Sequence, residues 1–174
     1  MHIIMKKSVL LLFLLPLLIL QFCMSPTESE YNPEKDLTAI RTVLEQYTIA
    51  RENEDIKMVE EVWSNDEDII LIGTDSDENY VGWDQIRKAI QKQFGSFENV
   101  LISITDQKIQ TDLDGRTAWF SQTLNYNFIY NSVAMTYQGI RSTGVLRKQD
   151  GKWKIIQVHL SVPVEVDIDE EMTH

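Results

Sequence analysis

The chain has 174 residues, of which 43% are hydrophobic and 25% are charged, a balance typical of a globular domain with a sound core. Its formal net charge of −11 argues against nucleic acid, whose phosphates require a basic surface, and against a polybasic contact with a membrane. A single cysteine excludes an intramolecular disulfide. The fold must therefore be held together by its apolar core.

The N-terminus has the pattern of a targeting segment. Two lysines precede an uninterrupted apolar run from Val9 to Leu20, which is shorter than the ~20 residues of a bilayer-spanning helix. Cys23 follows where bacterial lipoproteins are lipidated, although Phe22 stands where a small residue is usual. We expect residues 1–22 to be a signal peptide and Cys23 to anchor the protein to the bacterial cell envelope. Cleavage to a secreted protein and an uncleaved anchor are the alternatives.

Three helices are expected in the first half of the chain. Residues 23–35 are polar and suit a tether, and Asn32 followed by proline suits the start of a helix. Apolar residues then recur at helical spacing, at Leu37, Ile40, Leu44 and Tyr47. A short second helix is expected after Asp55 as its N-cap, and a third from about Trp83 to Phe94.

Strands dominate the second half. Ile69 to Ile72 is a compact apolar run, and Tyr80-Val81 is expected to return beside it. From residue 100 onward, apolar and polar residues alternate, and turns are expected at Asp114-Gly115, Asn131-Ser132 and Asp150-Gly151. Helices first and hairpin-linked strands afterwards predict an α+β fold. Strands this long must be strongly coiled, so the sheet should curl around the helices.

Two stretches carry a family resemblance. Residues 141–161 contain R-x-T-G-V-L, D-G-x-W-x-I and V-H-x-S in order, and residues 43–73 read VLEQYTIARENEDIKMVEEVWSNDEDIILIG. Both stretches resemble SnoaL-like domains of the nuclear transport factor 2-like superfamily. The resemblance covers about residues 36–163, taken as one domain, and leaves an acidic tail, residues 164–174.

The resemblance implies a cone-shaped domain in which a curved, mostly antiparallel sheet wraps three helices around a deep, mostly apolar pocket. It also implies a homodimer through the outer face of the sheet. Trp119 and Phe120 place an aromatic side chain on each face of one strand, which supports an interface there.

The chemistry of one enzyme of the superfamily, ketosteroid isomerase, is not expected here. That enzyme uses a tyrosine and a protonated aspartate as oxyanion donors and a second aspartate as the base. Tyr47 matches the tyrosine. Ile70 or Leu71 stands in place of the base, and Ser142 or Thr143 in place of the second acid.

Arg141, Thr143 and His159 are the polar side chains expected in the pocket. Strand alternation places Arg141 and Thr143 on one face, and the turn at Asp150-Gly151 brings His159 almost opposite Arg141. A guanidinium can bind a carboxylate through two hydrogen bonds, and an imidazole can exchange a proton. With Tyr47 reaching in from the first helix, these residues would bind a small hydrophobic ligand, with or without an acidic group. The alternative is a structural histidine with Arg141 on the rim.

Trp63 and Trp119 are further candidates for the pocket wall, with core packing as the alternative. The acidic stretch at residues 75–79 resembles the start of a calcium loop, but Tyr80 stands where that loop requires glycine, so no metal is expected. The sequence contains no glycine-rich phosphate loop and no nucleophile motif, so no cofactor is expected either.

Two functions follow from these residues. The favoured interpretation is a ligand-binding domain at the cell envelope that performs no catalysis. The alternative is an isomerase, cyclase or hydratase-type enzyme in which His159 and Tyr47 carry out acid–base chemistry.

The lipid anchor can be tested directly. We expect labelled palmitate to be incorporated into the wild-type protein in a bacterial host and not into a Cys23→Ala variant, because the lipid is attached through this cysteine. Immunoblots should show equal amounts of both proteins. Label in the variant, or none in the wild type, would rule out the anchor.

Overall fold

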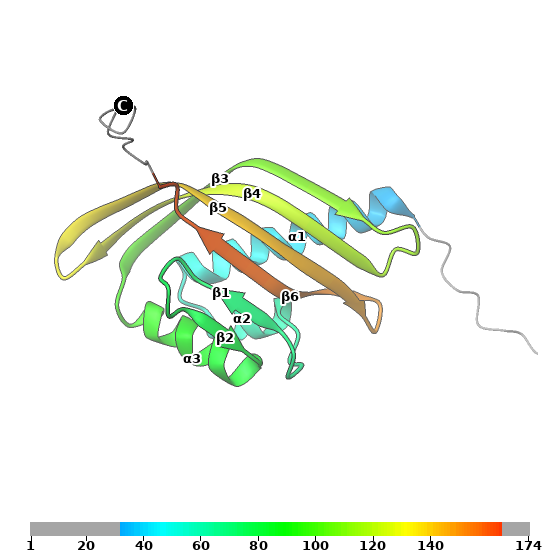
Figure 1. Ribbon diagram of the computed structural model, residues 1–174, viewed down its shortest axis with the longest axis horizontal. Helices are drawn as coiled ribbons and strands as arrows, with labels where there is room; N and C mark the ends of the chain where they lie inside the picture. The colour runs from blue at the N-terminus through cyan, green and yellow to red at the C-terminus, as the bar shows by residue number, and fades with distance from the viewer. Residues whose placement is uncertain (1–31, 165–174) are drawn as a thin grey trace, which may run out of the picture. The chain divides into compact units, whose positions relative to one another are not determined.

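Residues 32–164 are the part of the chain that the computed structural model describes, and they form three helices and six strands (Figure 1). The expected signal peptide, Cys23 and all but the first residue of the expected acidic tail lie outside these residues. Within them, no helix combines the length and the apolar character needed to cross a membrane.

The helices begin where their capping residues predict. Helix α1 (Pro33–Glu52) starts after Asn32, whose side-chain oxygen accepts a hydrogen bond from the Lys35 amide at 3.1 Å. Helix α2 (Ile56–Val62) is capped by the Asp55 carboxylate, which accepts from two backbone amides. Helix α3 spans Trp83–Phe94, as predicted. Residues 33–35, which were expected in the tether, belong to α1.

The six strands form one mixed sheet in the order β2-β1-β6-β5-β4-β3. Every neighbouring pair is antiparallel except β1 with β6, which is parallel. The mostly antiparallel sheet and the α+β class are therefore confirmed. The strands are β1 (Ile70–Ile72), β2 (Asn79–Val81), β3 (Glu98–Thr111), β4 (Thr117–Tyr130), β5 (Val133–Gln149) and β6 (Lys152–Ser161).

Irregular pairing bends the long strands. The register of β3 against β4 shifts at two places, next to Asn99 and Asp106, which both have φ of 53°. The register of β4 against β5 shifts beside Asn125, whose side-chain oxygen accepts a hydrogen bond from the Gly139 amide at 3.0 Å. Gly139 has φ of 71°, which favours glycine. Because bulges bend a strand and increase its twist, the sheet curves over α1 (Figure 1).

The apolar core lies between the helices and the covered face of the sheet. It includes the expected α1 stripe, of which Ile40 and Leu44 are almost fully buried. A second, smaller cluster lies under the far part of the β4–β5 hairpin and contains Ile102, Leu124, Tyr126, Phe128 and Ile140. Tyr47 of α1 belongs to the main cluster, and Arg51 one turn later lies against Tyr126 of the second cluster.

A buried carboxylate fixes the other end of α1 to the sheet. Asp36 is only 5% exposed and accepts hydrogen bonds from the Lys148 ammonium at 2.6 Å and from the Trp153 indole at 3.0 Å. Lys148 lies on β5 and Trp153 on β6. These contacts set the direction in which α1 runs beneath the sheet, and so place its last turns beside the cavity described next.

Candidate functional site

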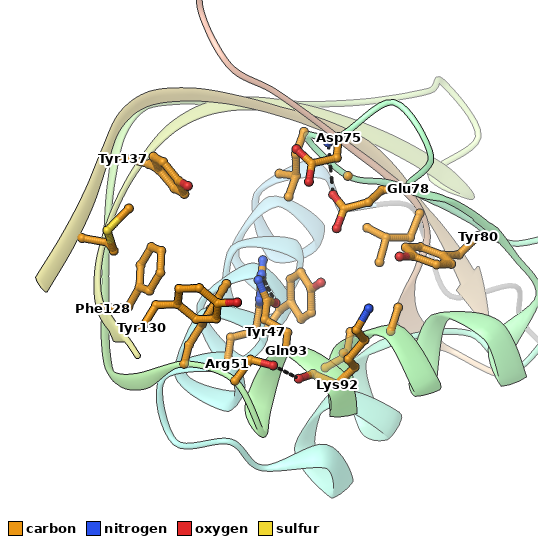
Figure 2. Close-up of a pocket in the computed structure, with 18 residues that line it drawn as sticks. Tyr47, Arg51, Asp75, Glu78, Tyr80, Lys92, Gln93, Phe128, Tyr130 and Tyr137 are labelled. Carbon is orange, nitrogen blue, oxygen red and sulfur yellow. Dashed lines mark hydrogen bonds between the residues drawn. The ribbon is translucent and has the colours of Figure 1, made fainter. Parts of the chain in front are cut away.

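A cavity of about 380 Å³ opens between the last turns of α1, helix α3, the β1–β2 turn and the β4–β5 hairpin (Figure 2). Each of these four elements contributes side chains to its lining. Tyr47 and Arg51 come from α1, Lys92 and Gln93 from α3, and Asp75, Glu78 and Tyr80 from the β1–β2 segment. The hairpin contributes Phe128, Tyr130, Met135 and Tyr137.

Arg51 is a buried cation without a carboxylate partner. Arg51 is 8% exposed, and its Nη2 atom donates a hydrogen bond to Oε1 of Gln93 at 2.6 Å. The guanidinium carbon lies 5.6 Å from the ring centre of Tyr47 and 5.0 Å from that of Tyr126, within the range of cation–π attraction. Its buried Nε has no hydrogen-bond partner. Within residues 32–164, no ion pair involves Arg51.

The surroundings keep this group charged. Burial lowers the pKa of the Arg51 guanidinium, but attraction to Tyr126, Tyr47 and Glu78 outweighs burial and raises that pKa above its ordinary value. Burial raises the pKa of the Tyr126 phenol, and the nearby positive charge of Arg51 only partly counters it. The Tyr126 hydroxyl is buried and has no hydrogen-bond partner. Arg51 thus carries a permanent positive charge among neutral phenols.

One wall of the cavity is aromatic. The rings of Phe97 and Phe128 are stacked with their centres 4.2 Å apart, and the ring of Tyr130 meets Phe97 edge-on at 5.9 Å. Tyr137 lies 5.5 Å from Phe128. Figure 2 shows Phe128, Tyr130 and Tyr137 together on one side of the cavity, on the ribbon of the hairpin. Such a wall suits a flat apolar ring.

The facing wall carries charge. The Glu78 carboxylate accepts hydrogen bonds from the backbone amides of Thr74 and Asp75 at 2.9 and 3.2 Å, which holds the tight β1–β2 turn. Asp75 and Lys92 are exposed at the rim. Burial, together with the nearby carboxylates of Glu78, Asp77 and Asp75, raises the pKa of the Tyr80 phenol, so this group stays neutral at ordinary pH.

Of the six residues expected to bind a ligand, Tyr47 alone lines this cavity. Trp63 lies behind it in the core, 2% exposed, with its ring meeting Tyr47 edge-on at 5.8 Å. Trp63 therefore supports Tyr47 from behind instead of forming the cavity wall.

The expectation that Arg141 and His159 face the cavity with Tyr47 is wrong. Arg141, Thr143 and His159 are exposed, on the sheet face opposite the helices. Thr143 pairs with His159, whereas Arg141 pairs with Ser161 and donates a hydrogen bond to the Val162 carbonyl at 3.2 Å. The three side chains share a face, as alternation predicts, but alternation alone does not say which face is buried.

The inward face of β5 carries two large apolar side chains with two small residues between them. Ile140 and Leu146 are 4% and 0% exposed, and Ser142 is 2% exposed. A Cβ atom added to Gly144 would lie 2.6 Å from the ring of Phe120, so this position has to be glycine. The strand therefore turns its apolar side chains toward the core and the polar side chains of Arg141 and Thr143 outward.

Trp119 and Thr143 border a separate hollow of about 420 Å³ on the outer face, beside Lys108 and Gln157. Trp119 is 44% exposed, and its indole donates to the Gln110 side chain at 2.7 Å. The acid–base pair of His159 and Tyr47 that the enzymatic alternative requires is not formed, because Tyr47 lines the cavity beneath the sheet and His159 is exposed on the outer face.

Arg51 is the functional candidate that the sequence interpretation missed. It follows Tyr47 by one helical turn, so the two share a face of α1. An arginine on a stripe that is otherwise apolar was the available signal. Arginine is seldom fully buried unless it is paired, and that expectation favoured an exposed position.

We expect Arg51→Met to leave the free energy of unfolding unchanged or to raise it by up to about 2 kcal/mol, because methionine fills the space without a buried charge. Arg87→Met, which removes an exposed ion pair between Arg87 of α3 and Glu60 of α2, should change the free energy of unfolding by no more than ~0.5 kcal/mol. Urea denaturation measures both. A loss well above 2 kcal/mol in Arg51→Met would show that Arg51 serves the fold and not a ligand.

Comparison with known proteins identifies the architecture. The sequence model of the SnoaL-like domain matches residues 40–165. Among curated proteins, no relative matches this chain.

Three solved structures illustrate the likeness of fold. A nuclear transport factor 2-like superfamily protein from Salmonella enterica is 17% identical with a TM-score of 0.70, covering 79% of this chain and 97% of that one. A nuclear transport factor 2-like protein from Streptomyces avermitilis, named for a proposed dehydratase activity, is 15% identical with a TM-score of 0.67. The match covers 76% of this chain and 100% of that one. A Novosphingobium aromaticivorans protein, named for a proposed aromatic ring hydroxylase activity, is 20% identical with a TM-score of 0.68. The match covers 78% of this chain and 94% of that one.

At these identities the structures show a shared fold and leave activity open. The family model covers most of the domain that the structure describes. The chain belongs to the SnoaL-like domain family.

Proposed function

We propose that this domain binds a small hydrophobic ligand in the cavity between α1, α3 and the β4–β5 hairpin, and that it does so without catalysis. The observation that carries the proposal is the cavity itself. Its volume of about 380 Å³ falls within the ~300–1,000 Å³ of small-molecule sites. The stacked rings of its aromatic wall can also make stacking contacts with a ring-shaped ligand.

Arg51 and Tyr47, the polar side chains that α1 contributes to the cavity, favour binding over proton transfer. No histidine or cysteine lines it within the described part of the chain. Arg51 keeps its proton at all ordinary pH values, so it can hold a ligand but cannot act as a general base. Tyr47 lacks the histidine partner that the enzymatic alternative requires, since His159 lies on the outer face of the sheet.

The cellular setting of this binding is proposed from sequence. The pattern of residues 1–22 and the position of Cys23 support a lipid-anchored protein of the bacterial cell envelope, with secretion as the alternative. A ligand at that site would be met on the periplasmic or outer side of a membrane.

Filling the cavity should abolish binding. Ala89 lies on α3 and lines the cavity, whereas Gln91 is an exposed residue two positions later on the same helix. We expect Ala89→Trp to weaken calorimetric binding of a neutral aromatic probe such as naphthamide at least about tenfold, or ~1.4 kcal/mol. Gln91→Trp should bind as the wild type does. Equal affinity in both variants would place the binding elsewhere, and conversion of a bound ligand to product would contradict a non-catalytic role.

The outer sheet face is proposed to pair with a second copy of the chain. Trp119 is 44% exposed there beside the outer hollow, and tryptophan is enriched at protein–protein interfaces. Light scattering should give a dimer mass for the wild type and a monomer mass for Trp119→Glu, because a buried carboxylate would be left unpaired. A monomeric wild type at micromolar concentration would contradict the pairing.

A further inference from the structure

We propose that the ligand is an aromatic monocarboxylic acid, whose carboxylate binds Arg51 and whose ring lies against the wall formed by Phe128, Tyr130 and Tyr137. This inference rests on the proposed ligand-binding function and names the class of ligand. Figure 2 shows Arg51 and Tyr47 between the hairpin rings on one side and the Glu78 turn on the other.

The first argument is the unmatched charge of Arg51. Burying a cation is costly unless it is paired, and this guanidinium is 8% exposed and forms no ion pair within residues 32–164, although the Glu78 carboxylate attracts it across the cavity. Two phenol rings and one amide oxygen contact it, and its buried Nε has no hydrogen-bond partner. A carboxylate is the group whose geometry and charge match a guanidinium. A carboxylate entering the cavity would supply the missing counter-charge.

The second argument is the neutral residue that orients the guanidinium. Gln93 accepts a hydrogen bond from Nη2 of Arg51 at 2.6 Å, from helix α3. A glutamate here would form an ion pair with Arg51 and leave little attraction for an incoming acid. Glutamine fixes the guanidinium without neutralising it. Gln93 is therefore a positioning residue that keeps the charge of Arg51 available.

The third argument limits the ligand to one negative charge. The charged groups that line the cavity besides Arg51 are Asp75, Glu78 and Lys92. Glu78 is held toward the cavity by its hydrogen bonds to two backbone amides, and Asp75 lies beside it (Figure 2). A second carboxylate on the far end of a ligand would meet these two acids, with the exposed Lys92 as the only nearby cation among the described lining residues.

A matched pair of probes separates this inference from the proposed function. Naphthoate and naphthamide, substituted at the same ring position, differ in charge and hardly in shape. With the full chain in calorimetry, we expect naphthoate to bind on the order of ten- to one-hundredfold more tightly than naphthamide, the range for hydrogen bonds to a charged group. In Arg51→Met the ratio of the two affinities should fall to about one.

A second variant keeps the test valid if Arg51→Met fails to fold. Gln93→Glu retains Arg51 and supplies an internal carboxylate, so the preference for naphthoate should be lost here as well. Gln91→Glu makes the same change of charge on the exposed side of α3 and should keep the wild-type preference. Loss of the preference in both glutamate variants would show a general charge effect and overturn the role of Gln93.

Other outcomes decide between the two proposals. If neither probe binds the wild type, the proposed function itself fails. If both probes bind the wild type equally, the function stands and the carboxylate inference is overturned. A preference for naphthoate that survives in Arg51→Met but disappears in Lys92→Met would place the anchor at the rim and overturn the role of Arg51. Naphthalene dicarboxylate binding more tightly than naphthoate would overturn the limit to one charge.

Discussion

The burial of the Arg51 guanidinium between the phenol rings of Tyr47 and Tyr126 is a constraint that the sheet and two helices have to satisfy together. Removing a cation from water is unfavourable by several kcal/mol unless its surroundings compensate. Here the compensation comes from three separate elements, since Tyr47 belongs to α1, Tyr126 to β4 and Gln93 to α3. The sheet, the first helix and the third helix must therefore all be correctly placed before the charge can be accommodated.

The curvature of the sheet makes that arrangement possible. Flat strands would pass over α1 and would not form the aromatic wall of the cavity. The irregular pairing at Asn99, Asp106 and Asn125 bends β3, β4 and β5. The β4–β5 hairpin follows this bend (Figure 1), and its residues Phe128, Tyr130 and Tyr137 line the cavity together with Arg51. At the other end of α1, the hydrogen bonds of Asp36 with Lys148 and Trp153 prevent the helix from shifting along the sheet.

Local signals allowed the fold to be predicted from sequence. The caps at Asn32 and Asp55 and the turn at Asp150-Gly151 act within a few residues, so helix and strand ends could be read directly. The residues that form the site could not be predicted in this way, because they are set by contacts between segments far apart in the sequence. Whether Arg141 or Ser142 faces inward depends on packing against Phe120 and α1, which the alternation of β5 cannot show. The cavity residue Arg51 was hidden for the same reason, because its burial is created by β4 and α3.

The separation of the two hydrophobic clusters has a consequence for how this family diversifies. Phe128, Met135 and Tyr137 belong to or pack near the small cluster under the hairpin, whereas Ile40 and Leu44 belong to the main core. Sequence change near the tip of the hairpin would alter the shape of the cavity wall while the main core stays intact. Because Tyr130 and Tyr137 are 44% and 47% exposed, substitutions there would affect stability little, and natural selection could reshape this wall without eroding the fold.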